Sequence, residues 1–160
     1  MVRTKFAKKE VKEFDQRVLE LARVTRVVAG GKRMSFRATV LIGNRKGKIG
    51  LGIAKGADVT QAVDKAVNQA KKDMLEIVTV NDTIPFEVAA KYSAAKVILK
   101  PAAKGRGIVA GGAVRWVLTL AGIPNVSAKI IGRTSNAINN ARATLVALNY
   151  FAKNKQYIQR

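Results

Sequence analysis

The sequence contains no cysteine and no histidine, and its acidic residues are few. Without cysteine the chain has no disulfide and no thiolate for a metal or for nucleophilic catalysis, which fits a reducing, cytoplasmic environment. Without histidine it lacks the commonest general base in enzymes. The 10 Asp and Glu residues show no metal-ligand spacing. We therefore expect no enzyme activity, no cofactor and no metal.

Long apolar runs are also lacking. No segment approaches the roughly 20 consecutive apolar residues that span a bilayer. The basic stretch from Met1 to Glu13 has no apolar segment after it, so it does not read as a secretory signal. Hydrophobic residues still make up 48% of the chain, with only 6% aromatic. We therefore expect a folded chain with a core of small and branched side chains and no membrane span.

Positive charge dominates what is present. There are 30 Lys and Arg residues against 10 Asp and Glu, a formal net charge of +20. All carboxylate side chains lie between Glu10 and Glu87, so residues 88–160 contain none. A compact body this cationic repels itself unless a polyanion neutralises it, whereas surfaces charged only for solubility usually mix both signs. Nucleic acid is the predicted partner.

The change in charge suggests two domains. It falls near Val80-Asn81-Asp82-Thr83-Ile84-Pro85, which also has the composition of a turn or short linker. We expect a basic N-terminal tail over 1–12, a first domain over 13–81, a second over 82–151 and a basic C-terminal tail over 152–160.

The first domain reads as three strands, a helix and a further strand. Alternating and β-branched residues predict strands over 19–28, 35–42, 49–54 and 75–80. The helix follows the third strand, with Asp58 as its cap and Gln61 completing a capping box. Its apolar positions recur at helical spacing, at Val59, Ala62, Val63, Ala66, Val67, Ala70 and Met74. One helix should therefore cover one face of a sheet.

The second domain reads as a hairpin, a helix, a strand and a helix. The hairpin strands are expected over 86–90 and 95–99, the first helix over 113–121 and the next strand over 126–131. Gly122 and Pro124 should end the first helix, and Thr134 or Ser135 should cap the second. Trp116 lies at helical spacing with Leu120 and is expected in the core or at an interface. The fold class is α+β.

Two basic loops contain glycine. In Gly43-Asn44-Arg45-Lys46-Gly47-Lys48 the glycines allow a turn, and Arg45, Lys46 and Lys48 could reach a phosphate backbone. An ordinary hairpin with solubilising charge is the alternative. Around Gly30-Gly31 the candidate RNA-binding cations are Arg23, Arg26, Lys32 and Arg33. With the charge of the whole chain, we favour RNA contact at both loops.

A third glycine-rich stretch, from Lys104 to Gly112, precedes a helix whose N-terminus favours anions. It does not match GxxxxGK[ST], because Ala113 follows Gly112, nor GxGxxG, because Ala110 occupies the third glycine position. Contact with an RNA phosphate is the favoured interpretation. A nucleotide-hydrolysing enzyme is a second hypothesis, and a protein that coats DNA through charge alone is a third.

Four segments carry a family resemblance, in order along the chain: 23–36 (RVTRVVAGGKRMSF), 96–102 (KVILKPA), 107–115 (GIVAGGAVR) and 136–144 (NAINNARAT). They resemble bacterial small-subunit ribosomal protein five, and the resemblance runs from about residue 13 to about 151. It implies an N-terminal β-β-β-α domain like a double-stranded-RNA-binding domain. It also implies a C-terminal β-hairpin/α/β/α domain of the type named after the family.

The same resemblance implies a function. Members of the family are structural constituents of the small subunit that bind 16S ribosomal RNA and contact ribosomal proteins four and eight. They lie near the messenger RNA entry channel and support assembly and decoding accuracy. On this basis we expect a cytoplasmic, ribosome-bound protein that does not form a homo-oligomer.

Residue roles are carried over by motif. The loop over 24–33, with Gly30 and Gly31, would meet ribosomal RNA near the spectinomycin site. Ribosomal protein four would contact Gly107, Gly111, Gly112 and Arg115. Further RNA contacts are expected at Lys55, Lys104, Arg106 and Arg133.

The sequence departs from the family pattern at three of these places. Ala29 stands where the family often has Lys, which removes one expected phosphate contact. Ala137 replaces a usual Pro at the start of the last helix. Arg106 replaces a small polar residue and adds charge.

Overall fold

The computed structural model describes residues 13–77 and 79–153. The predicted N-terminal tail and most of the C-terminal tail lie outside the described residues. The first half contains β1 (Asp15–Val28), β2 (Gly31–Gly43), β3 (Lys48–Gly56), α1 (Val59–Lys72) and β4 (Met74–Glu76). The second half contains β5 (Val88–Tyr92), β6 (Ala95–Pro101), β7 (Ile108–Val109), α2 (Gly112–Ala121), β8 (Val126–Ile130) and α3 (Ala137–Lys153). The α+β class is confirmed.

The first half forms an antiparallel sheet in the order β1-β2-β3-β4. Its three long strands are confirmed, and each is longer than predicted. The fourth strand ends at Glu76, not near Val80. Ile77 still donates its backbone N–H to the Gly47 carbonyl oxygen, and Val80, which was expected in the strand, instead bridges to Thr83 around a tight turn.

Helix α1 covers one face of this sheet, as predicted. Its small side chains at Ala62, Ala66 and Ala70 are fully buried against the apolar face of β2. Asp58 is the N-cap, but the predicted capping box is wrong: its carboxylate accepts a hydrogen bond from the Thr60 hydroxyl at 2.6 Å, and no side-chain capping hydrogen bond forms. That hydrogen bond also lowers the pKa of Asp58.

The second half forms a mixed sheet in the order β5-β6-β8-β7, with β7 parallel to β8. The predicted hairpin, strand and helices are present, and Gly122 ends α2 in a left-handed conformation. The short strand β7 was not predicted. The cap of α3 is Asn136, whose side-chain oxygen accepts the N–H groups of Ile138 and Asn139, so the predicted caps Thr134 and Ser135 are wrong.

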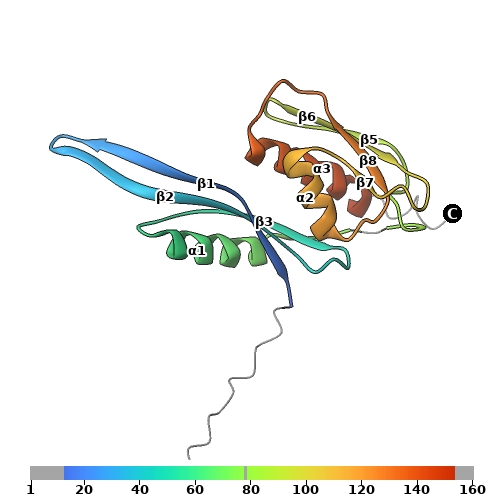
Figure 1. The fold of residues 1–160 in the computed structure, drawn as a ribbon, viewed down its shortest axis with the longest axis horizontal. Coiled ribbons are helices and arrows are strands. Elements are labelled where there is room, and N and C mark those ends of the chain that lie inside the picture. The colour runs from blue at the N-terminus through green and yellow to red at the C-terminus, as the bar shows by residue number, and fades with distance from the viewer. Residues whose placement is uncertain (1–12, 78, 154–160) are drawn as a thin grey trace, which may run out of the picture.

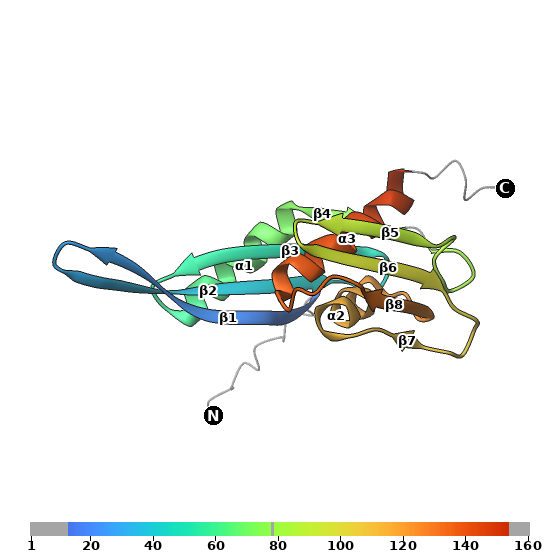
Figure 2. The same ribbon diagram turned by 90° about the horizontal axis from the view of Figure 1, so that it is seen from above.

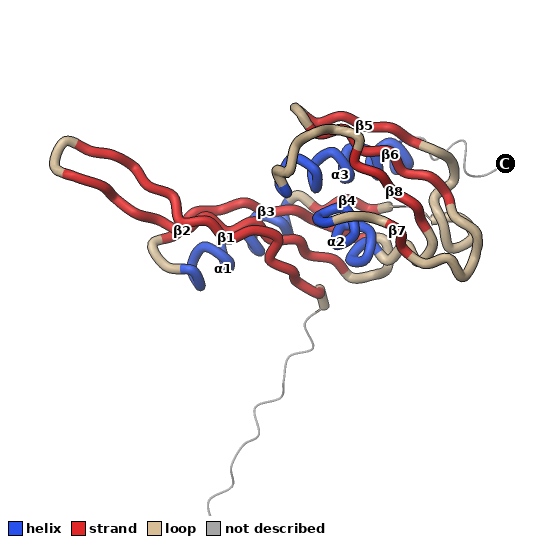
Figure 3. Tube along the Cα trace, turned by 45° about the horizontal axis from the view of Figure 1, so that its top comes forward, coloured by secondary structure: helices blue, strands red, loops and turns tan. Residues whose placement is uncertain are grey.

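One apolar core joins the two halves. The face of the first sheet opposite α1 packs against the second half, so Leu41 and Ile49 share a cluster with Val117 and Leu118 of α2. Figures 1 and 3 show α2 and α3 lying between the two sheets. Residues 38–43 of β2 are buried on both faces for this reason. Within the described part of the chain, no helix is long and apolar enough to cross a membrane.

Candidate nucleic-acid interface

The β1–β2 hairpin extends beyond the rest of the molecule. Strand β2 pairs with β3 only from Phe36 onward, while its pairing with β1 continues to the turn at Gly31. Residues 25–34, which we call the hairpin tip, are all exposed, and Figures 1 and 2 show them as a two-stranded ribbon projecting past α1. A Cβ atom at Gly30 or Gly31 would meet nothing within 4 Å. The tip is therefore open to a partner on both faces.

The two faces of the hairpin tip differ in chemistry. Arg26 lies directly opposite Arg33, and residues directly opposite in a ladder share a face. The other face has Met34 at 56% and Val27 at 74% exposure, opposite Thr25 and Lys32. Like charges across a ladder destabilise it. One face thus offers paired guanidinium groups for an anion, and the other offers apolar contact area.

Carboxylates do not neutralise the hairpin tip. The three ion pairs among the described residues are Arg37–Glu20 at 2.9 Å, Arg45–Asp15 at 2.7 Å and Lys100–Glu87 at 3.2 Å. The first lies at the base of the projecting ribbon, and none includes Arg23, Arg26, Lys32 or Arg33. Those four cations, all predicted to bind RNA, are exposed.

The second glycine-containing loop, residues 43–48, has a different environment. We call it the joint loop, because its backbone is bound to the end of α2: Arg45 and Gly47 donate their N–H groups to the carbonyl oxygens of Leu120 and Ala121, at 3.1 and 2.9 Å. A Cβ atom at Gly43 would collide with the Leu120 backbone, and one at Gly122 with Arg45. The side chains of the three predicted cations are still exposed.

A cation–π contact also connects the two halves of the protein. The guanidinium carbon of Arg17, on β1, lies 4.0 Å from the ring centroid of Trp116, on α2. Trp116 is 37% exposed. The prediction that this residue lies at an interface is confirmed, and the interface is the one between the two halves.

The side chain of Asn125 fixes the backbone of the glycine-rich loop over residues 104–107. This buried side chain accepts the N–H groups of Gly105 and Gly107 at 3.0 and 3.1 Å, and Arg106 donates its N–H to Ala103. Three successive N–H groups that would have to cradle a phosphate are therefore already bonded. The loop instead presents the side chains of Lys104 and Arg106 to solvent. Sequence reasoning missed Asn125, which follows a proline and carries no motif.

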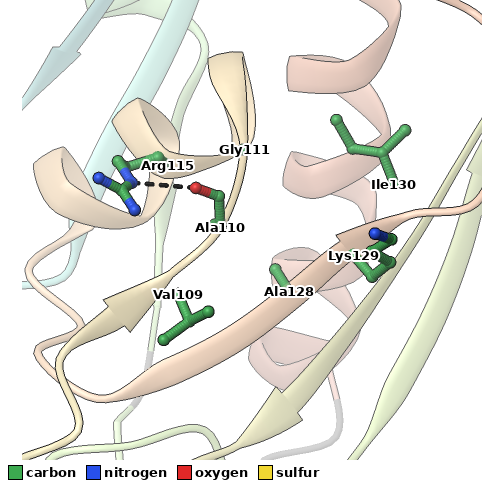
Figure 4. Close-up of a pocket in the computed structure, with 7 residues that line it drawn as sticks. All are labelled: Val109, Ala110, Gly111, Arg115, Ala128, Lys129 and Ile130. Carbon is green, nitrogen blue, oxygen red and sulfur yellow. Dashed lines mark hydrogen bonds between the residues drawn. The ribbon is translucent and has the colours of Figure 1, made fainter.

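The start of α2 borders a shallow groove. The groove has a volume of about 410 Å³ and lies between Arg115 and the edge of β8 at Ala128, Lys129 and Ile130. Figure 4 shows Arg115 turned back to Ala110, whose carbonyl oxygen accepts its Nε–H at 2.9 Å. Gly111 and Gly112 are exposed, and no side chain caps this helix. The predicted protein-contact residues Gly111, Gly112 and Arg115 thus come together.

The predicted RNA-binding residues do not form one patch. Lys55 is exposed at the end of β3, in register with Arg37 and close to the base of the hairpin. The loop with Lys104 and Arg106 lies at the opposite end of the molecule from the hairpin tip (Figure 2). Arg133 is exposed between β8 and α3. Among the described residues, no group of three or more acidic side chains could hold a metal.

Comparison with known proteins gives one consistent match. Residues 14–78 match the family model "Ribosomal protein S5, N-terminal domain", and residues 90–159 match "Ribosomal protein S5, C-terminal domain". The chain is 49% identical over 147 residues to small ribosomal subunit protein uS5 of Nostoc punctiforme, covering 91% of this chain and 83% of that one. It is 46% identical over 139 residues to uS5 of Thermotoga maritima, covering 87% and 78%. A match to uS5c of Rhodomonas salina, 48% identical over 142 residues, covers 88% and 84%.

Proposed function

Because the chain belongs to the ribosomal protein S5 family, we propose that it is a structural, non-enzymatic constituent of the small ribosomal subunit that binds ribosomal RNA chiefly through its hairpin tip. Such a protein acts in the ribosome. The observation that carries the proposal is the exposed tip with Arg26, Lys32 and Arg33, which together with the neighbouring Arg23 have no carboxylate partner among the described residues.

The arrangement of side chains on the hairpin tip is better suited to recognising the shape of an RNA than its base sequence. Arg26 and Arg33, opposite each other on one face, can engage phosphates of an irregular RNA as two charged forks. Met34 and Val27 on the other face can rest against sugars or unstacked bases, which are accessible in loops and bulges of folded RNA. Lys55 adds charge at the base of the ribbon, while Lys104, Arg106 and Arg133 would meet other RNA segments.

The finer assignments are also proposals. We infer 16S ribosomal RNA, ribosomal proteins four and eight, and messenger RNA near its entry channel as partners, with roles in assembly and decoding accuracy. The groove beside Arg115 supports a protein contact, and we assign it to protein four together with Gly107. The two family models support a division into domains over 13–81 and 82–151.

A salt titration tests the RNA proposal. Binding of the full chain to a 16S ribosomal RNA fragment should weaken steeply with salt, because each phosphate contact releases counterions. Changing Arg23, Arg26, Lys32 and Arg33 to Gln should reduce the slope of log affinity against log salt by about 4, roughly 1 per contact. The protein should co-sediment with small subunits and leave them only at high salt. A slope unchanged by the four substitutions would refute the hairpin as the main contact.

A DNA-coating protein makes a different prediction. Attraction through charge alone would give similar affinity for duplex DNA and for folded ribosomal RNA of the same length. A shape-specific contact should favour the ribosomal RNA. Equal affinities in direct competition would therefore count against the proposed function.

A further inference from the structure

The second sheet has an exposed face that none of the predicted site residues occupies; one of its residues, Lys129, also lines the groove beside Arg115. Buried and exposed residues alternate along β6, where Val97 and Leu99 are fully buried among the side chains of the core and the residues between them point the other way. In Figure 1, α2 and α3 lie on the inner side of this sheet, and no described element covers the other side. We call that side the outer face; its residues are Ala89, Lys91, Lys96, Ile98, Lys100, Ser127 and Lys129, with Val109 of β7 at its edge.

The strand register gathers the lysines of this face. Lys91 is directly opposite Lys96, and Lys129 is directly opposite Ile98, the next outward residue after Lys96. Directly opposite Cβ atoms lie about 5 Å apart and diagonal ones about 7–8 Å apart, so three ammonium groups share one small area. Lys100 pairs with Glu87, but none of the ion pairs among the described residues includes Lys91, Lys96 or Lys129.

This arrangement costs folding stability in the isolated protein. Like charges directly opposite in a ladder repel each other, and residues 88–160 contain no carboxylate side chain to compensate. On α1, by contrast, the exposed lysines Lys65, Lys71 and Lys72 are interleaved with Asp64 and Asp73, as on an ordinary solvated helix face. The outer face therefore differs from a surface charged only for solubility.

The chemistry of the outer face favours RNA over protein. Lys is depleted at protein interfaces, whose centres are apolar. The larger apolar side chains of this face are only two, the half-buried Ile98 at its middle and the exposed Val109 at its edge. No aromatic side chain lies on the face, so it offers no platform for base stacking. Lysine does bind phosphate as a point charge. We propose that the outer face is a second RNA-binding surface, which holds the phosphate backbone of structured RNA without reading its sequence.

This inference extends the proposed function and shares its assumption that the partner is RNA, but it uses residues far from the hairpin tip in the chain. The test compares two triple variants of the full chain with equal loss of charge. One carries Lys91→Gln, Lys96→Gln and Lys129→Gln on the outer face. The matched control carries Lys65→Gln, Lys71→Gln and Lys72→Gln on α1. Both are titrated with salt against a 16S ribosomal RNA fragment and against an RNA duplex of arbitrary sequence.

For the outer-face variant, the slope of log affinity against log salt should be smaller by about 3 on both RNAs. For the control variant it should be smaller by less than about 1. The melting temperature of the outer-face variant should rise by about 1–3 °C, because the cross-strand repulsion is removed. Weaker RNA binding with higher stability is a combination that a merely structural role would not produce.

Three results would overturn the inference. One is an unchanged slope for the outer-face variant, and another is an equal loss in both triple variants, which would mean that only net charge matters. The third is unchanged RNA binding with lost binding to polyglutamate, which would indicate an acidic protein partner. The variant lacking the four hairpin cations separates the two proposals: if it alone loses RNA binding, the proposed function stands and the outer face is not an RNA site.

Discussion

The hairpin tip and the joint loop look alike in sequence, since each combines glycines with several cations, but their surroundings are opposite. At Gly30 and Gly31 an added Cβ atom would have no neighbour within 4 Å. At Gly43 it would overlap the backbone of Leu120, and at Gly47 it would lie 2.7 Å from the Ile77 carbonyl oxygen. In the tip, glycine keeps a turn open for a partner. In the joint loop, glycine lets one half of the protein approach the other.

The charges of the two loops differ in the same way. Arg45 of the joint loop forms an ion pair with Asp15 at 2.7 Å, although both side chains are more than half exposed. Its backbone, with φ at 54°, is fixed by the hydrogen bond to Leu120. Arg26 and Arg33 are directly opposite each other in the tip, so their side chains share one face, and they form none of the described ion pairs. The glycines and cations of the joint loop thus belong to a backbone that is bonded to the other half of the protein, whereas those of the tip belong to a ribbon whose two strands pair only with each other.

A pair of glycine substitutions gives the largest expected difference between the loops. Gly43→Ala should lower the free energy of unfolding by about 3 kcal/mol, because the new methyl group overlaps backbone that is fixed in the core between the halves. Gly30→Ala should change it by less than about 0.5 kcal/mol. Neither residue has a positive φ, so backbone strain does not complicate the comparison. Urea denaturation measures both, and equal effects would contradict the role assigned to the joint loop.

The next comparison concerns RNA binding at equal loss of charge. Arg26→Gln with Arg33→Gln should weaken binding to a 16S ribosomal RNA fragment about tenfold at moderate salt, because two phosphate contacts are lost. Lys46→Gln with Lys48→Gln should weaken it about threefold or less, through net charge alone. Filter binding across a salt series measures both pairs. A greater effect of the joint-loop pair would mean that the RNA contacts the joint loop instead of the projecting ribbon.

The sequence predicted the features that follow from periodicity. The stripe containing Ala62, Ala66 and Ala70 predicted the buried face of α1, and alternation predicted the strands. Gly122 ends α2 as predicted, because glycine readily adopts the left-handed conformation found there. The caps were less predictable, because Asp58 and Asn136 depend on which nearby donor each side chain reaches.

The candidate sites were harder to predict, because they depend on contacts between distant segments. Nothing near residue 125 indicates that its side chain bonds to Gly105 and Gly107. Likewise, Lys91, Lys96 and Lys129 are single lysines in three separate strands, and only the register brings them together. Cations that cluster along the chain can be recognised in the sequence, whereas a cluster formed across strands cannot.

The smallest expected effect concerns a second contact between the two halves, the cation–π contact. Arg17 stacks on Trp116 across the two halves, and a partly exposed cation–π contact contributes about 0.5–1 kcal/mol. Arg17→Gln should therefore lower the free energy of unfolding by that amount. Arg23→Gln, which removes the same charge at the base of the projecting ribbon on the same strand, should leave it unchanged or raise it slightly.

A double-mutant cycle separates the contact from the loss of charge. If the stacking is real in solution, Arg17→Gln should cost little in a Trp116→Leu background, since the ring that attracts the guanidinium is already gone. The same cycle with Arg23→Gln should show no coupling, because the cation over the Trp116 ring is Arg17 and not Arg23. Coupling at Arg17 alone would show that, of two cations six residues apart on one strand, only Arg17 holds the halves together, which leaves Arg23 available for the proposed RNA contact.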